Sequence, residues 1–288
     1  MKTPLSILIL SFAMAHAQDL DAALEAAAPA NEPVQATFKS IRVVTSQSVE
    51  TSQKGVLNMS ISHRFGQYSA GVNDLYGLDF GRIRLGLDYG ITEWMDVGFE
   101  RSNNEGKPVD LSVKFKLLRQ TTSGDIPLSV SWFSAGYLMT KTDEGLGYNL
   151  TLAGRFSSLN QLIVARKFNE RLSLQLSPTL VTRQLRPLNG DDEVALGLTG
   201  AGRFKVAKRV ALTAEATPMF TGTNINWDPA IAFGVDIETG GHVFQLYVSN
   251  STYLSEDRMY TQTKTGPNSA LDIETLALGF NITRGYSF

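Results

Sequence analysis

The chain of 288 residues contains no cysteine, and Lys and Arg (26) nearly balance Asp and Glu (28), for a formal net charge of −2. The absence of cysteine excludes disulfides, thiolate metal sites, cysteine nucleophiles and a lipid anchor on an N-terminal cysteine. Proteins that bind nucleic acid usually carry a basic excess, so we expect no nucleic-acid partner. After the N-terminus, no apolar run reaches the ~20 residues that a membrane-spanning helix needs.

The N-terminus has the pattern of a signal peptide. Lys2 gives a basic start, residues 5–15 are apolar, and Ala15–His16–Ala17 forms a small-x-small cleavage site. We therefore predict that residues 1–17 are a signal peptide cleaved after Ala17, and that the protein is exported. Residues 18–54 are predicted to be a periplasmic tail, either a binding segment for a periplasmic partner or a partial plug.

From about Lys54 onward, apolar and polar residues alternate. Over residues 109–117, Val, Leu, Val, Phe and Leu alternate with Asp, Ser, Lys and Lys, which is typical of strands with one apolar face. Several such runs reach ten residues or more, whereas strands in globular proteins average about 5–6 residues. Tilted strands of about 9–11 residues are what a bilayer requires.

Connection lengths separate a transmembrane barrel from a soluble β-sandwich, which alternates in the same way. The connections after even-numbered strands are mostly short and those after odd-numbered strands are longer and polar, as in outer-membrane barrels. The sequence predicts an all-β, antiparallel, up-and-down transmembrane barrel over residues 55–288, with both termini in the periplasm. Fourteen strands are the alternative, if Phe38–Thr51 is a strand and a further one exists. The twelve predicted strands are 55–66, 79–90, 94–101, 108–119, 126–139, 155–168, 171–184, 193–205, 209–220, 229–238, 242–250 and 275–288.

The last strand carries apolar residues on one face and ends on Phe288. It resembles the terminal strand of bacterial outer-membrane proteins, whose final aromatic residue is bound by the barrel assembly machinery. The resemblance implies that Phe288 is an assembly signal. The expected partners are this machinery, the outer-membrane lipids and lipopolysaccharide.

Several longer motifs resemble one family. They are SHRFG at 62–66, RLGLDYG at 84–90, ARKFNER at 165–171, LQLSP at 174–178 and DIETGGHVFQL at 236–246. The family is an uncharacterised membrane-bound β-barrel group found mainly in Bacteroidota, and the resemblance runs from Phe38 to Phe288. It implies a barrel in the outer membrane and supplies no substrate.

Residues with catalytic or metal-binding potential are few. After signal cleavage only His63 and His242 remain, and they are expected at opposite ends of the barrel, where they cannot share a metal ion. No Gly-x-Ser-x-Gly motif is present. We therefore expect no enzymatic activity, no metal and no cofactor.

Charged residues of both signs lie on the polar faces of the predicted strands and are expected to line the lumen. A turn centred near Thr92 would set Arg84 opposite Glu100 as an ion pair and Asp88 opposite Asp96. Such mixed charge favours a cross-braced lumen with little or no ion conduction. Two functions stay open: a narrow channel or transporter for small solutes, or a closed structural or partner-binding barrel. The predicted lumen residues are Arg64, Arg82, Arg84, Asp88, Glu100, Asp110, Lys114, Lys116, Arg183, Arg203, Lys205, Glu215, Asp236 and Glu238.

Overall fold

The computed structural model describes residues 31–104, 106–142, 151–183, 193–222, 227–264 and 272–288. The predicted signal peptide, its cleavage site after Ala17 and the first part of the predicted tail lie outside these residues. In the described part of the chain, no helix has both the length and the apolar character needed to cross a membrane.

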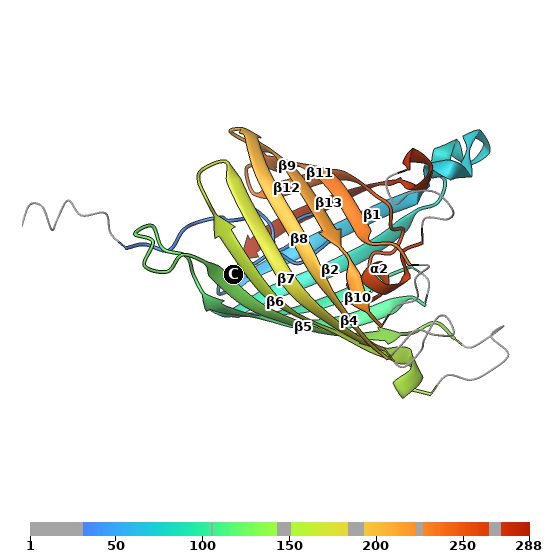
Figure 1. The fold of residues 1–288 in the computed structure, drawn as a ribbon, viewed down its shortest axis with the longest axis horizontal. Coiled ribbons are helices and arrows are strands. Elements are labelled where there is room, and N and C mark those ends of the chain that lie inside the picture. Colours follow the sequence, from blue (N-terminus) through green and yellow to red (C-terminus); the bar gives the residue numbers. More distant parts are fainter. Residues whose placement is uncertain (1–30, 105, 143–150, 184–192, 223–226, 265–271) are drawn as a thin grey trace, which may run out of the picture.

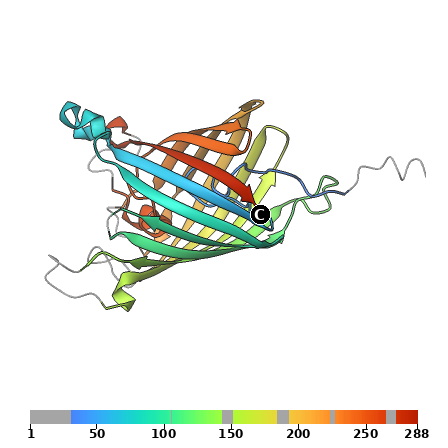
Figure 2. The ribbon, with the colours of Figure 1, turned by 180° about the vertical axis from the view of Figure 1, so that it is seen from behind.

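Twelve antiparallel strands form a closed ring. Figures 1 and 2 show the ribbon of this ring from two opposite sides. Each strand pairs with the next, and β1 pairs with β13 to close the ring. A further short strand, β10 (Met219–Thr221), pairs with β8 outside the ring. The prediction of a twelve-stranded transmembrane barrel is confirmed. The ring strands are β1 (Val56–Gln67), β2 (Arg82–Thr92), β3 (Met95–Ser102), β4 (Pro108–Leu118), β5 (Ser129–Met139), β6 (Phe156–Lys167), β7 (Leu172–Arg183), β8 (Val194–Ala207), β9 (Val210–Thr217), β11 (Ala230–Thr239), β12 (His242–Ser249) and β13 (Ala277–Ser287).

Two expectations about the strands are wrong. Residues 38–51 contribute no strand to the ring, and the only β-bridge within them joins Arg42 to Gln47, so the fourteen-stranded alternative fails. The predicted strand 209–220 is two strands, β9 and β10. They are separated at Pro218, which has no N–H to donate to a neighbouring strand.

The two faces of the strands have opposite character. Along β2, Arg84 and Asp88 are buried inside the ring, whereas Leu85 and Leu87 are exposed on the outside. A soluble sandwich would bury its apolar face instead. Apolar residues outside and polar residues inside are the arrangement of a membrane barrel.

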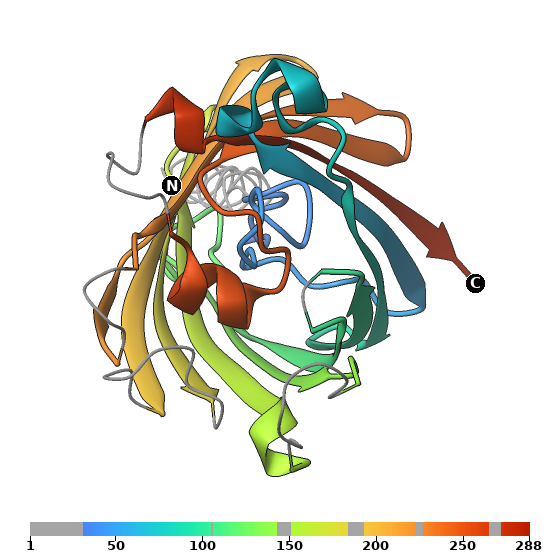
Figure 3. The ribbon, with the colours of Figure 1, turned by 90° about the vertical axis from the view of Figure 1, so that its right-hand side faces the viewer.

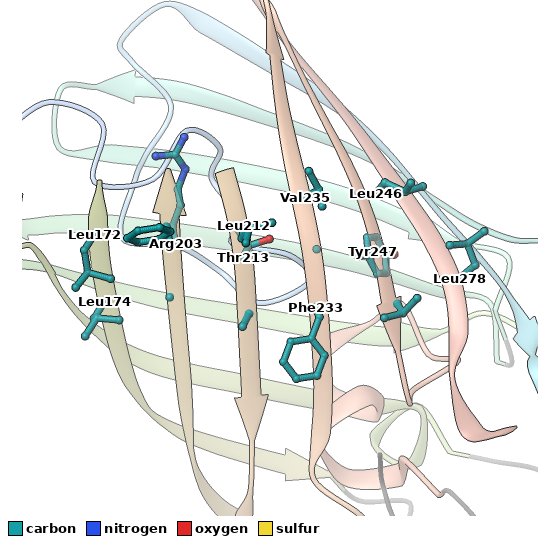
Figure 4. A pocket seen from close by; sticks show the side chains of 15 residues that line it. Leu172, Leu174, Arg203, Leu212, Thr213, Phe233, Val235, Leu246, Tyr247 and Leu278 are labelled. Carbon is teal, nitrogen blue, oxygen red and sulfur yellow. The ribbon is translucent and has the colours of Figure 1, made fainter. Parts of the chain in front are cut away.

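The outer surface carries shallow apolar hollows. One of about 570 Å³ lies over β7, β8, β9, β11 and β12 and is shown in Figure 4. Leu174, Phe233 and Leu246 line it, and each of these side chains is exposed. Because this face is turned away from the lumen, the hollow belongs to the apolar surface that contacts lipid.

The connections define two ends of the barrel. Short turns at 168–171, 208–209 and 240–241 lie at one end, which we call the turn end. Longer connections lie at the other, the loop end, among them residues 68–81 and 250–264. Figure 3 looks into the ring from the loop end, and both the helix α2 (Glu256–Gln262) and an N-terminal segment are seen inside it.

Candidate functional site

The N-terminal segment inside the ring comprises residues 38–52, which we call the lumen hairpin. Its chain reverses through two backbone hydrogen bonds, Val43 N to Ser46 O (2.9 Å) and Ser48 N to Ile41 O (2.9 Å). Val43 and Val44 are almost completely buried. They belong to one apolar cluster with inward-facing side chains of β5, β6 and β7. The hairpin therefore fills part of the lumen.

The tip of the lumen hairpin is bound by Glu215 of β9. Its carboxylate accepts the backbone N–H groups of Val44 (3.1 Å), Thr45 (3.0 Å) and Ser46 (3.1 Å). The hydroxyl groups of Thr45 and Ser46 donate to the same carboxylate. Successive backbone N–H groups that converge in this way form a concave anion-binding nest. Glu215 thus anchors the tip through one buried charge.

Polar side chains from six other strands bind the rest of the hairpin, mostly through its backbone. These bonds satisfy backbone groups that would otherwise be buried without a partner. Together with Glu215 they attach the hairpin to seven strands. The six anchors are Asp96 of β3 to Ser52 N, Lys114 of β4 to the carbonyls of Ile41 and Glu50, Ser131 of β5 to Val49 O, Gln175 of β7 to Val49 N and Gln47 O, Gln245 of β12 to Val43 O, and Asn281 of β13 to Val44 O.

A second segment enters the lumen from the loop end. Residues 250–263, which we call the inward loop, follow β12 on the way to β13 and contain α2. Ser255, Glu256 and Tyr260 are each at most 1% exposed. The wall holds this loop by its carbonyl groups: Arg64 donates to Ser251 O (2.9 Å) and to Tyr253 O. The lumen is therefore occupied from both ends.

The two segments meet in a buried network of five ionisable groups. Arg42 of the lumen hairpin contacts Glu100 of β3 (2.5 Å) and Glu256 of the inward loop. Arg84 of β2 contacts Glu100 (2.5 Å), Asp110 of β4 (2.8 Å) and Glu256 (2.8 Å). Burial alone would raise the pKa of Glu256, but Arg42 and Arg84 hold that pKa well below its usual range. Glu256 therefore stays ionised at neutral pH.

The predicted register of β2 and β3 is wrong by two residues. Arg84 lies opposite Ser102, and Glu100 lies opposite Gly86. The ladder shifts between Gly90 and Thr92, an irregularity next to the turn that the sequence did not reveal. The ion pair between Arg84 and Glu100 exists, but it is diagonal rather than directly across the strands. The predicted pairing of Asp88 with Asp96 is also wrong, since Asp88 faces Gly98.

The other predicted lumen residues divide between the two ends. At the turn end, Arg203 contacts Glu238 (2.7 Å) and Asp236 (3.6 Å), and Lys39 of the hairpin contacts Glu238 (3.1 Å). At the loop end, Arg183 donates to the carbonyls of Thr261 and Gly222. Of the fourteen residues, ten are buried and four, Arg82, Lys116, Lys205 and Glu238, are half-buried.

Sequence reasoning missed the residues that the hairpin and the inward loop bring into the lumen. Arg42 and Glu256 lie outside the strands with alternating apolar and polar residues. The alternation therefore could not identify them as lumen residues. Gln175, Gln245 and Asn281 do lie on the polar faces of predicted strands. Their uncharged amide side chains at inward-facing positions were a signal in the sequence that could have identified them as lumen residues.

No metal centre is seen among the described residues, in which no group of three or more His, Asp or Glu could hold an ion. His63 stacks on Phe280 of β13, with ring centroids 5.1 Å apart. His242 begins β12 at the turn end. The register of β13, which lies between them, sets His63 opposite Phe280 and His242 opposite Arg284. The two histidines are therefore not at opposite ends of the barrel, as expected, but about 13 Å apart along the strand direction.

Phe288 is 89% exposed at the turn end, and its N–H donates to Gly55 O (3.3 Å). Its ring contributes little to the packing of the fold, so its removal should leave the folded barrel intact. If the ring is an assembly signal, deleting Phe288 should reduce the amount of protein in the outer membrane far more than Glu170→Ala in an exposed turn. Quantitative blotting of membrane fractions measures this, and equal amounts of the two variants would remove the assembly role.

Comparison with one solved outer membrane channel supports the fold, and a second structure is also similar. The COG4313 outer membrane channel from Pseudomonas putida F1 matches with a TM-score of 0.51 and 11% identity, over 86% of this chain and 100% of that chain. The NanC porin matches with a TM-score of 0.49 and 9% identity, over 81% and 100%. No curated protein gives a significant match. Residues 38–286 match the family described as a membrane bound beta barrel domain (DUF5777), and because that match spans most of the chain, the protein belongs to this family of unknown function.

Proposed function

We propose that the protein is an outer-membrane channel for small solutes, which the lumen hairpin and the inward loop close in its resting state. The observation that carries this proposal is how the lumen is filled. Barrels of about eight strands fill with their own side chains, and those of about 16–18 strands hold an aqueous channel. Here the lumen is occupied by separate segments of chain, bound largely through hydrogen bonds to their backbones. Such segments can leave without unfolding the ring.

The proposal includes an orientation in the membrane. We infer that the mature chain begins after Ala17, that the turn end faces the periplasm and that the loop end faces outward. Residues 31–34 already bind the turn between β4 and β5, through Val34 N to Gln120 O (2.7 Å) and Thr122 N to Glu32 O (2.9 Å). A periplasmic partner that binds the tail at this place would pull on the lumen hairpin, which follows it in the chain. Lipopolysaccharide would surround the loop end.

A closed barrel without transport is the second candidate. The observation that favours it is the buried charge network, because Arg42 and Arg84 brace both segments against the wall. A brace that never opens would give a rigid outer-membrane scaffold. The two candidates predict different conductance once the hairpin is loosened.

Single-channel recording in planar bilayers separates the candidates. The unaltered protein is expected to conduct little or not at all, because both segments are in place. A double variant, Gln175→Ala with Gln245→Ala, removes two anchors and leaves buried backbone groups of the hairpin unpaired, at about 1–3 kcal/mol each. We expect it to show frequent openings.

The matched control is Gln161→Ala. Gln161 is equally buried, but its amide donates to Thr179 and Thr199 on the wall rather than to the hairpin. The Gln161→Ala variant should show as little conductance as the unaltered protein. A folded double variant that also stays silent would favour the scaffold, and a large conductance in the unaltered protein would contradict the resting closure.

A further inference from the structure

Arg64 is a buried cation that has only neutral partners. Its side chain is 0% exposed, and it donates to the carbonyls of Ser251 and Tyr253 and to the hydroxyl of Tyr247. Within the described part of the chain no carboxylate contacts it, and its Nε has no hydrogen-bond partner. Burying a charge is costly unless it is paired. The geometry at Arg64 is therefore that of a site lacking an anion.

Other arginines of the wall that the inward loop covers also bind this loop through its carbonyl groups. Arginines of β1, β2 and β7 each donate to at least one backbone carbonyl of the loop. Carbonyl oxygens carry only a partial negative charge, so an ionised oxygen in their place would bind these guanidinium groups more strongly. The bonds are Arg64 to Ser251 and Tyr253, Arg82 to Thr252, Arg84 to Leu254, and Arg183 to Thr261.

One carboxylate already occupies this region, and it comes from the loop itself. One oxygen of Glu256 accepts from Arg42 and from Gln47 (3.0 Å), both in the lumen hairpin. The other accepts from Arg84 (2.8 Å) and from Tyr137 (3.1 Å), both on the wall. All four donors are buried. They form a complete carboxylate site with two donors for each oxygen.

We propose that this is the binding site for a small solute that carries a carboxylate group, and that Glu256 and the carbonyls of the inward loop occupy it until the solute arrives. The solute carboxylate takes the place of Glu256 between Arg84 and Tyr137, and a second polar group reaches Arg64. The inward loop is then released toward the loop end. This inference rests on the proposed function, in which that solute is the cargo.

The site also explains why the two closing segments meet where they do. Because Arg42 and Gln47 supply half of the donors, a solute bound there contacts the lumen hairpin directly. Arrival of the solute from the loop end therefore changes the bonds of the hairpin that closes the turn end. The same residues would recognise the solute and open its path.

The test measures binding, by calorimetry of the full mature protein in detergent at constant KCl, with malonate as the probe and neutral malonamide as its chemical control. In the unaltered chain malonate competes with Glu256. In Glu256→Gln the competing charge is gone, so the dissociation constant for malonate should fall about tenfold, which corresponds to about 1.4 kcal/mol. Malonamide should give no binding in either protein.

Two variants control for charge and for folding. Glu274→Gln removes one negative charge from an exposed position in the same connection, and it should bind malonate as the unaltered chain does. Arg64→Gln should weaken malonate binding at least about fivefold, whereas Arg166→Gln, which removes an exposed arginine at the turn end, should not. Each variant is first checked for the heat-dependent gel mobility of a folded barrel. If Glu256→Gln does not fold, the comparison of Arg64→Gln with Arg166→Gln tests the inference.

Three results would overturn the inference: equal malonate affinity in Glu256→Gln and Glu274→Gln, equal affinity in Arg64→Gln and Arg166→Gln, or equal heats from malonate and malonamide. Inorganic phosphate is titrated as a second anionic probe in the same calorimetric experiment. If phosphate binds and malonate does not, the assignment of a carboxylate is wrong. Because binding is measured without conductance, a barrel that binds malonate but never conducts would contradict only the proposed function.

Discussion

Replacing Arg84 with alanine is expected to destabilise the barrel strongly. Its guanidinium group contacts Glu100, Asp110 and Glu256, and all four side chains are at most 4% exposed. Without Arg84, Asp110 keeps no cation among its ion pairs, and Arg42 alone faces the other two carboxylates. Breaking a buried pair by removing one partner costs about 3–5 kcal/mol. Urea unfolding in lipid vesicles, followed by gel mobility of unheated samples, measures the loss.

The matched control for this substitution is Arg101→Ala. Arg101 lies on β3, is exposed, and bonds Lys107 O and the hydroxyl of Thr140, so its loss should cost less than about 1 kcal/mol. In bilayers, Arg84→Ala protein that remains folded should also open more often than the Arg101→Ala control. Unfolding midpoints that agree for the two variants would show that the network does not brace the lumen.

Replacing Glu215 with alanine should release the tip of the lumen hairpin. Three buried N–H groups of Val44, Thr45 and Ser46 lose their acceptor, at about 1–3 kcal/mol for each unsatisfied group. Even the lower bound sums to about 3 kcal/mol, which is about a hundredfold in the population of the released hairpin. Because the chain has no cysteine, a single Ser48→Cys provides a clean reporter: Ser48 is 0% exposed.

The measurement is the rate at which a maleimide labels that cysteine in folded protein. With Glu215 present, labelling should be slow, since the thiol is covered by the wall. With Glu215→Ala it should rise by about a hundredfold, whereas Glu170→Ala, an exposed acid in a turn at the same end as the tail, should leave the rate unchanged. Fast labelling in the parent, or the same rate in all three proteins, would mean that the hairpin is not held by Glu215.

The barrel could be predicted from the sequence because its determinants are local and repeated. Alternation along runs such as 109–117 fixes which side chains face outward, and the rhythm of short and long connections fixes the direction of each strand. These two signals are enough to predict twelve ring strands. Register cannot be predicted from them, because a shift such as the one between Gly90 and Thr92 depends on turn geometry that the residue types leave undetermined.

The contents of the lumen could be predicted only in part. The charged residues of the wall, including Arg84, Glu100 and Glu215, were predicted from the polar faces of the strands. Their partners come from segments without regular periodicity, and Arg42 reaches Glu256 across 214 positions of sequence. Contacts of this kind arise from closure of the ring around the chain. A reading of each segment by itself cannot supply them.

The attachment of the lumen hairpin to the first strand constrains how the molecule is assembled. Residues 38–52 lie a few residues before β1, and β1 pairs with β13 at the seam of the ring. The hairpin has bonds to both β12 and β13, so seating of the hairpin and pairing of the strands at this side of the ring stabilise each other. We therefore expect the two steps to be cooperative. A ring that closes first would leave the amides of Gln245 and Asn281 without these backbone acceptors until the hairpin enters from the turn end.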